Sequence, residues 1–325
     1  MNKKIYYNEA IGAAVAEEMR RDENVVCLGL DQASGGGAFF TVSKLAKEFG
    51  TKRVVDTPIS EEAYAGLSVG SAATGLRPVT EIQFNDWLTI ASDQIVNQGA
   101  FMKYMFGGSL KMPVVFHGNC GGYYSAGPQH SKMLESWFAL IPGIKVILPS
   151  TPWDVKGLMK SAIRDDNLTI LLWHKKLLAT KGEVSEDPEY VIPIGKADVK
   201  HEGSDVTIIT YAYQVLQALN VAKKLEAEGI SVEVVDLRTI KPMDRETIIA
   251  SVQKTGRAIC LQETWLNCSV MSEVAAVIAE SGVALKKPLI RIGAKEAPIA
   301  FAKNLEDYIL PSEADIEEAV RKLMK

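Results

Sequence analysis

The sequence has few cysteines, no long apolar run and no block of basic residues. Its four cysteines are Cys27, Cys120, Cys260 and Cys268, and no two of them are spaced as C-x-x-C. Because Cys27 and Cys260 lie within apolar runs, we expect buried free thiols, which indicates a reduced, cytoplasmic location. No apolar stretch approaches the ~18 residues of a membrane helix. With a net charge of -4, neither a membrane nor a nucleic acid is expected as a partner.

Two phosphate-binding motifs of α/β enzymes are also missing. No G-x-G-x-x-G follows a strand pattern, which argues against the usual dinucleotide fingerprint. No G-x-x-x-x-G-K-[ST] is present either, so the phosphate loop of nucleotide-binding proteins is not expected. These absences leave an α/β protein whose function must be sought in other residues.

Strand patterns and helix patterns alternate along the whole chain. This alternation predicts an α/β fold with a doubly wound, mostly parallel sheet over residues 1–185. A charged segment that contains Pro188 and Pro193 predicts a linker over residues 186–202. A second, smaller α/β domain is expected over residues 203–325.

The string Asp56-Thr57-Pro58-Ile59-Ser60-Glu61 follows a short apolar strand pattern and precedes a helix rich in small residues. It places the carboxylate of Glu61 between a strand end and a helix start. An acid at this position stabilises the helix through its dipole. The same position is where α/β folds hold their chemistry. The string alone leaves both interpretations open.

Six further groups of strings accompany the Asp56–Glu61 string in a fixed order. They are Gly75-Leu76-Arg77-Pro78-Val79-Thr80-Glu81, Asp93-Gln94-Ile95-Val96-Asn97-Gln98 with Tyr104-Met105-Phe106-Gly107-Gly108, Gln129-His130-Ser131, Ile141-Pro142-Gly143-Ile144-Lys145-Val146, Pro149-Ser150-Thr151-Pro152 and Ala162-Ile163-Arg164-Asp165-Asp166-Asn167. Over nearly its whole length the chain resembles the beta subunit of the decarboxylating first component of 2-oxo-acid dehydrogenase complexes, including the acetoin dehydrogenase branch. The resemblance implies a pyrimidine-binding domain for thiamine diphosphate and a domain like the transketolase C-terminal domain.

The resemblance also implies roles for individual residues. Glu61 matches the glutamate that holds N1′ of the aminopyrimidine, and Ile59 and Gln83 match residues that line this ring. Trp87 matches an aromatic residue that stacks on the ring, and His130 matches the active-site histidine. A potassium site is implied at Val114, Ala162, Asp165 and Asn167.

The implied chemistry suits these residue types. A carboxyl group bonded to N1′ has to share a proton near neutral pH, and burial raises the pKa of a carboxyl group into that range. The cofactor then acts as the electron sink. A histidine beside the reacting centre can donate or accept protons.

Structural alternatives stand beside these functional interpretations. Glu61 could act only as a helix-start acid, Trp87 as core packing, and Asp165 and Asn167 as an ordinary turn. For His117, the sequence leaves open whether the side chain packs in the core or contributes to the site. We expect His174, beside two lysines, at the surface or in a supporting position.

Another absence bears on partners. Thiamine enzymes of the family hold the diphosphate and Mg2+ through a Gly-Asp-Gly segment, which this chain does not contain. The resemblance therefore implies a separate alpha subunit in an α2β2 heterotetramer, with this chain inactive alone and a lipoyl acyltransferase core as a further partner. The implied substrate is a small carbonyl compound: pyruvate, a branched-chain 2-oxo acid or acetoin. Leu30 replaces an acid found in many members, which bears on the choice of substrate. Alternatives are the C-terminal half of a split transketolase and a non-catalytic subunit.

Overall fold

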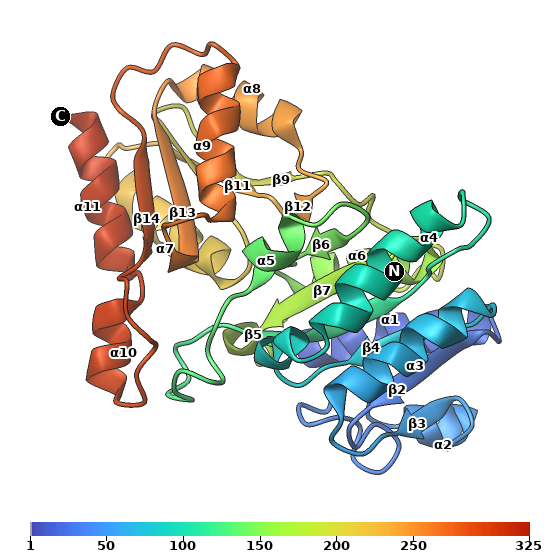
Figure 1. Ribbon diagram of the computed structural model, residues 1–325. Helices are drawn as coiled ribbons and strands as arrows, with labels where there is room; N and C mark the ends of the chain where they lie inside the picture. The colour runs from blue at the N-terminus through green and yellow to red at the C-terminus, as the bar shows by residue number, and fades with distance from the viewer. Residues whose placement is uncertain (1) are drawn as a thin grey trace. The chain divides into compact units, whose positions relative to one another are not determined.

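A computed structural model describes residues 2–325 and divides the chain into two compact units. The first unit contains the chain up to Cys120 and Trp137–Ile194. The second contains Gly121–Ser136 and Gly195–Lys325 (Figure 1). The short segment 121–136, which carries His130, thus belongs to the second unit although residues of the first flank it on both sides.

The first unit is built on a parallel sheet with the strand order β6-β7-β5-β4-β2-β3. Its strands are β2 (Val25–Gly29), β3 (Val54–Asp56), β4 (Arg77–Glu81), β5 (Val115–Cys120), β6 (Lys145–Ile147) and β7 (Thr169–His174). Every residue of β2, β5 and β7 is buried. Parallel strands of this kind are covered on both faces, so they have continuous rather than alternating burial.

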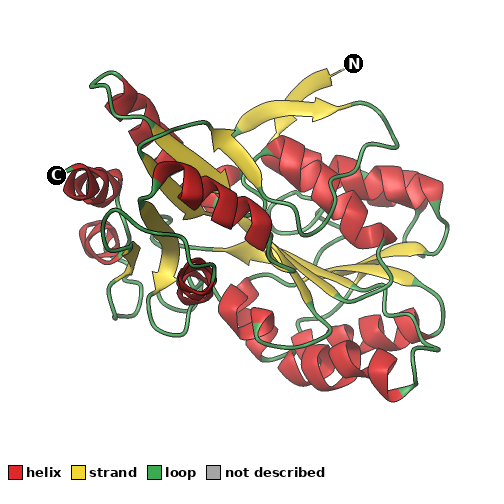
Figure 2. Cartoon of the chain, turned by 90° about the horizontal axis from the view of Figure 1, so that it is seen from above, coloured by secondary structure: helices red, strands yellow, loops and turns green. Residues whose placement is uncertain are grey.

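Helices cover both faces of this sheet (Figure 2). Among these helices, α1 packs against α6, and α3 packs against η2. The helical elements are α1 (Tyr7–Arg21), α2 (Leu45–Phe49), α3 (Glu61–Ala73), η1 (Asn85–Thr89), η2 (Gln94–Ala100), α4 (Phe101–Met105), α5 (Glu135–Ala139, which spans both units), α6 (Pro152–Arg164) and η3 (Lys175–Leu177). The doubly wound α/β fold predicted from the sequence is confirmed for this unit.

Helix α6 shows how local sequence sets a boundary. The hydroxyl of Thr151 accepts a hydrogen bond from the backbone N–H of Asp154 at 3.1 Å, and Pro152 occupies the first helical position. Both features satisfy or avoid the unpaired N–H groups of a helix start.

The second unit has its own sheet, with the order β14-β13-β10-β11-β9, in which β9 alone is antiparallel to its neighbour. The strands of this sheet are β9 (Asp198–His201), β10 (Val206–Thr210), β11 (Val232–Asp236), β13 (Ala258–Trp265) and β14 (Ile290–Ala294). The unit also contains β12 (Thr239–Lys241), which is not part of this sheet. Its helices are α7 (Tyr213–Glu226), α8 (Arg245–Thr255), α9 (Val270–Glu280), α10 (Lys303–Ile309) and α11 (Glu313–Met324). Apolar side chains of β10, β11, β13, α7 and α11 form its core.

Some local details differ from the sequence patterns. Strand β9 lies within the predicted linker 186–202, and β1 (Asn2–Tyr6) pairs with β8 (Lys181–Ser185) where no strand was predicted. None of the helices in residues 2–325 is both long and apolar enough to cross a membrane. Cys27 and Cys260 are buried free thiols, as expected.

Candidate functional site

The carboxyl ends of the parallel strands in the first unit meet at one edge of its sheet. β2 ends at Gly29, β3 at Asp56 and β4 at Glu81, and β2 lies between the other two. Open parallel sheets bind their ligands beyond this edge. The segments that follow β3 and β4, which contain Glu61 and Gln83, therefore lie at the same edge.

Glu61 is the first residue of α3 and is partly exposed. Ser60, not Glu61, is the N-cap residue. The nearby carboxylate of Asp56 accepts backbone N–H groups of Ala33 (2.6 Å) and Ser34 (3.2 Å). Glu61, by contrast, makes no hydrogen bond or ion pair within residues 2–325. The helix dipole can stabilise a carboxylate that has no such partner. The acceptor oxygens of Glu61 are therefore not engaged by residues 2–325.

The other three predicted ring contacts are also at this edge. Ile59 lies between β3 and α3 and is 76% exposed, which is high for an apolar side chain. Gln83 is partly buried, and its amide nitrogen lies 3.4 Å from the carbonyl oxygen of Leu30. Trp87 is partly buried in η1. An apolar surface beside an unpaired carboxylate suits a flat ring that carries hydrogen-bonding nitrogens. These residues fit an aminopyrimidine, and their individual roles stay predictions.

Glu81 is a buried carboxyl group that the sequence analysis did not single out. One of its oxygens accepts hydrogen bonds from the Gln32 side chain at 2.6 Å and from the Thr41 hydroxyl at 3.2 Å. Burial raises the pKa of Glu81 to about 7, and these hydrogen bonds oppose the rise. The only signal in the sequence was a glutamate within an apolar strand pattern. The carboxyl group connects β4 to the glycine-rich loop 32–41.

Aromatic contacts hold the same loop at a second point. The ring of Phe39 makes edge contacts with Phe84, at 5.8 Å between centroids, and with Trp173, at 5.5 Å. The loop is therefore fixed near the ends of β4 and β7 by one carboxylate and two aromatic rings.

His117 and His174 are core residues of the first unit. His117 is 2% exposed, and burial lowers its pKa to about 3, so the ring is neutral and its Nδ1 accepts from the Trp173 indole at 3.3 Å. His174 is also buried, and its Nδ1 accepts from the backbone N–H of Lys176 at 3.1 Å. Of the two placements expected for His174, the one at the surface is wrong, because the side chain is buried and caps η3. A supporting position stays a prediction.

The string Gly66-Leu67-Ser68-Val69-Gly70 has the G-x-S-x-G pattern of a nucleophile elbow, but it lies inside α3. An elbow requires a strand-to-helix turn. The Ser68 hydroxyl is buried, donates to the Tyr64 carbonyl at 2.7 Å and contacts the Thr80 hydroxyl at 2.7 Å. The pattern therefore serves helix packing.

His130 belongs to the second unit. It is partly exposed, and its backbone N–H donates to the Gly127 carbonyl at 3.3 Å. The structure thus places the two residues predicted to be catalytic in different units, Glu61 in the first and His130 in the second.

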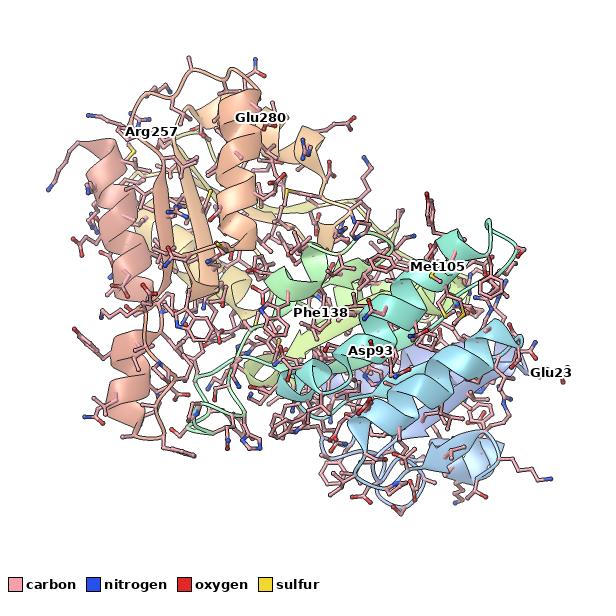
Figure 3. All side chains as sticks on the ribbon, viewed as in Figure 1. Glu23, Asp93, Met105, Phe138, Arg257 and Glu280 are labelled. Atoms are coloured by element: carbon pink, nitrogen blue, oxygen red, sulfur yellow. The ribbon has the colours of Figure 1, made fainter. Side chains whose placement is uncertain are left out.

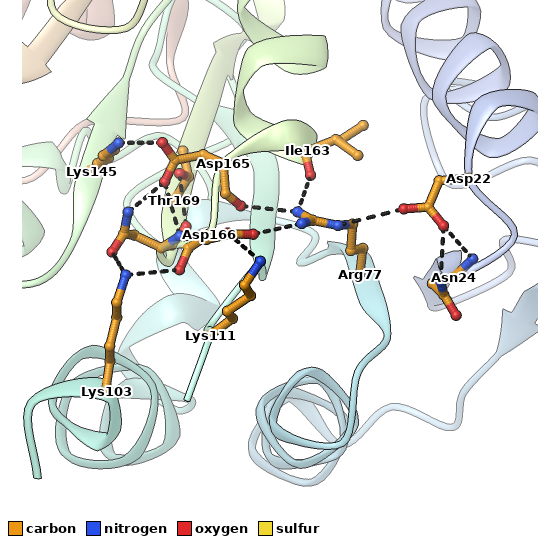
Figure 4. A network of polar contacts seen from close by, with 11 residues as sticks. Asp22, Asn24, Arg77, Lys103, Lys111, Lys145, Ile163, Asp165, Asp166 and Thr169 are labelled. Carbon is orange, nitrogen blue, oxygen red and sulfur yellow. Dashed lines mark hydrogen bonds and ion pairs between the residues drawn. The ribbon is translucent and has the colours of Figure 1, made fainter. Parts of the chain in front are cut away.

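Two residues of the predicted potassium site lie in the loop that follows α6 (Figure 4). One carboxylate oxygen of Asp165 accepts from the backbone and side-chain nitrogens of Asn167, at 2.9 and 2.8 Å, and the other pairs with Lys145. The amide oxygen of Asn167 accepts from the Lys103 ammonium at 2.7 Å. Every side-chain oxygen of these two residues is already hydrogen bonded.

Further cations surround the same loop. Arg77 donates to the carbonyl of Asp165 at 3.2 Å and pairs with the carboxylate of Asp166 at 2.5 Å. Lys111 pairs with Asp166 at 2.8 Å, and these two partners hold the pKa of Asp166 below its usual range. The loop is therefore neutralised by arginine and lysine.

The remaining two predicted potassium ligands contribute only main-chain oxygens. The carbonyls of Val114 and Ala162 each accept an N–H group, at 2.9 and 3.3 Å. A potassium ion would meet repulsion from the four surrounding cationic side chains and would find the side-chain oxygens engaged. In this arrangement the residues do not fit the ion, and potassium binding stays a prediction.

Comparisons with known families cover nearly the whole chain. The model of the transketolase pyrimidine binding domain matches residues 3–181, and that of the transketolase C-terminal domain matches residues 195–316. A beta subunit of acetoin:2,6-dichlorophenolindophenol oxidoreductase from Cupriavidus necator is 41% identical, over 100% of this chain and 99% of its own. A 2-oxoisovalerate dehydrogenase beta subunit from Bacillus subtilis is 42% identical over 98% of each chain.

Two further comparisons complete this picture. A pyruvate dehydrogenase E1 component beta subunit from Rhizobium meliloti is 42% identical, over 96% of this chain and 68% of its own. Among solved structures, a split gene transketolase in an inactive beta4 tetramer superposes with a TM-score of 0.79, covering 98% of both chains at 24% identity. This last likeness shows the fold alone.

Proposed function

Because this chain belongs to the transketolase-like family of E1 beta subunits of 2-oxo-acid and acetoin dehydrogenases, we propose that it forms half of a thiamine diphosphate active site. The observation that carries the proposal is its full-length similarity, at 41–42% identity, to beta subunits of three such enzymes. The unpartnered carboxylate of Glu61 at the ligand-binding edge of the sheet supports it.

The residues of this chain would act mainly on the pyrimidine half of the cofactor. When bound, thiamine diphosphate supplies the carbanion that serves as electron sink for the substrate carbonyl. Glu61 would share a proton with N1′ of the ring, and Ile59, Gln83 and Trp87 would hold the ring in place. His130 would donate and accept protons at the substrate. We also propose that residues 1–185 form this binding domain.

The other half of the site is proposed to come from an alpha subunit in an α2β2 heterotetramer. This chain has no Gly-Asp-Gly segment for the diphosphate and Mg2+, and we propose that the alpha subunit holds both. Glu61 is only partly buried in this chain, so the desolvation needed for proton sharing would come from cofactor and partner.

Exposed apolar side chains of the first unit support such a partner. Leu67 on α3 is 53% exposed, and Ile90 after η1 is 50% exposed. Met105, which Figure 3 labels at the end of α4, is 72% exposed. Large apolar side chains that are exposed on one unit are typical of protein–protein contacts.

The substrate is proposed from the relatives. Their names specify acetoin, pyruvate and 2-oxoisovalerate, and their identities to this chain differ by only one per cent. The proposed reaction therefore cleaves a small 2-oxo acid or acetoin and transfers the acyl group to the lipoyl arm of an acyltransferase. Residues 203–325 would contribute to docking on that acyltransferase core.

The proposal is tested by substituting Glu61 in the complex reconstituted with the alpha subunit. Glu61→Gln keeps the shape of the side chain but removes the proton-sharing carboxyl group, and we expect turnover to fall by about 100-fold or more. Glu62→Gln is the matched control, because Glu62 is an exposed acid in the same helical turn. Equal turnover in both variants would refute the catalytic role. Turnover by the purified chain without its partner would contradict the two-chain site.

A further inference from the structure

Two buried carboxylates hold the loop that carries His130. Glu263 of β13 accepts the backbone N–H of Gly122 at 2.6 Å. Glu306 of α10 accepts the backbone N–H of Tyr124 at 3.0 Å and that of Ser125 at 3.1 Å to each of its oxygens. Glu306 is completely buried, and Glu263 is 2% exposed. All of these groups belong to the second unit.

Glu306 depends on this loop for the stabilisation of its charge. Within residues 2–325, no lysine, arginine or histidine forms an ion pair with it. A buried carboxylate without a cation requires hydrogen-bond donors in place of water. Within residues 2–325, the donors to the Glu306 carboxylate are the backbone N–H groups of Tyr124 and Ser125 and the hydroxyl of Ser125. The carboxylate and the turn therefore stabilise each other.

The turn itself is unfavourable without such support. Tyr123 has φ +59° and Ser125 has φ +53°, in the left-handed region that side chains other than glycine seldom adopt. Strained backbone conformations of this kind persist only where contacts with neighbouring residues hold them in place, and they occur preferentially at functional sites. Glu306 supplies this constraint at Ser125, and the Tyr123 hydroxyl donates to the Pro311 carbonyl at 2.6 Å.

The same region of the chain also contacts the loop closer to His130. Gly127 has φ +76°, and a Cβ atom there would overlap the ring of Phe301, which precedes α10. The Gly127 carbonyl in turn accepts the backbone N–H of His130 at 3.3 Å. At the base of the loop, the N–H of Gly121 donates to the Lys132 carbonyl at 3.1 Å. His130 therefore lies between a closed base and a turn fixed by Glu306.

We propose that Glu306 is a positioning residue for His130, which it holds through the Tyr124–Ser125 turn. This inference rests on the proposed function, because it assumes that His130 takes part in proton transfer. Small displacements of a reacting group reduce rates severely, so loss of the clamp would lower turnover without loss of substrate contacts.

The test compares Glu306→Gln with Asp307→Asn in the reconstituted complex with the alpha subunit. Glu306→Gln replaces one acceptor oxygen by an NH₂ group that can only donate, so the Ser125 N–H loses one of its two carboxylate contacts and faces a donor in its place. Asp307 is the exposed neighbour on the same helix and pairs only with Lys303 at the surface. For Glu306→Gln we expect kcat to fall about 10- to 100-fold with KM within about twofold, and for Asp307→Asn no change.

A double-mutant cycle with His130→Ala separates positioning from general damage. If Glu306 acts through His130, adding Glu306→Gln to His130→Ala should lower kcat no further. Hydrogen exchange of peptides from residues 121–130 should accelerate in Glu306→Gln and not in Asp307→Asn, while exchange in β10 and β11 stays unchanged. This readout does not depend on activity.

The outcomes distinguish the inference from the proposed function. A loss of kcat that adds to that of His130→Ala, or exchange that rises throughout the second unit, would overturn the positioning role and leave the proposed function intact. Full activity of His130→Ala would remove His130 from the mechanism, and with it this inference. Wild-type kcat and exchange in Glu306→Gln would overturn the inference alone.

Discussion

The buried carboxyl group of Glu81 makes a quantitative prediction about stability and pH. Its pKa is about 7 in the folded chain, compared with 4.5 for an unburied glutamate. At one pKa unit per 1.36 kcal/mol, this gap corresponds to a free energy of about 3 kcal/mol. The sign follows from proton binding. Between pH 4.5 and 7 the unfolded chain has released the proton and the folded chain has kept it, so the free energy of unfolding falls as pH rises. The loss is complete above pH 7.

Glu81→Gln should remove this pH dependence. The amide oxygen can still accept from Gln32 and Thr41, and no charge has to be buried. We expect the stability of the variant relative to wild type to increase by about 3 kcal/mol between pH 4.5 and pH 8. Urea unfolding of the full chain, followed by far-UV circular dichroism at both pH values, measures this difference. Burial also raises the pKa of Glu135 to about 7. The contribution of Glu135 to the pH dependence cancels in this comparison, because the residue is present in both proteins.

Glu62→Gln is a suitable control, because an exposed acid on the same unit should leave the pH profile unchanged. Only the change in the stability difference between the two pH values is decisive, since a constant offset would reflect altered packing. Parallel profiles of wild type and Glu81→Gln would show that the carboxyl group is ionised in the folded chain at pH 4.5 to 7. That result would refute the argument from desolvation.

Three further predictions concern the loops. Replacing potassium with choline at constant ionic strength should leave the melting temperature unchanged, because lysine and arginine already neutralise the loop at Asp165. A fall of several degrees would show that potassium stabilises the fold and would support a potassium site. Lys145→Met should lower the free energy of unfolding, measured by urea titration, by about 1–2 kcal/mol, because Asp165 loses its ammonium partner. An unchanged urea midpoint would show that this ion pair does not contribute to stability. Gly127→Ala should lower the free energy of unfolding by about 1–3 kcal/mol, because the alanine must adopt φ +76° and its methyl group meets the ring of Phe301. Calorimetry that shows no loss of stability would contradict this packing.

Some features of this chain follow from the sequence because they depend on local patterns. Alternating strand and helix signals predicted the parallel α/β fold, since periodicity along the chain reflects burial at each element. The Asp56–Glu61 string placed Glu61 at a strand end and a helix start, which the structure confirms. The ordered strings along the chain also predicted the family, which the comparisons confirm.

Other features depend on contacts between residues far apart in the chain, and only the tertiary structure decided them. Glu306 is more than 180 residues from the turn that it holds, so no spacing rule could connect it with His130. Glu81 lies in a central strand covered on both faces, where alternation does not reveal which side chains are buried. The cations around Asp165 come from separate elements of the fold, so no string in the sequence could show that lysine already engages its carboxylate. Local periodicity thus determined the fold and the position of Glu61, and long-range packing determined which charges are buried and what holds them.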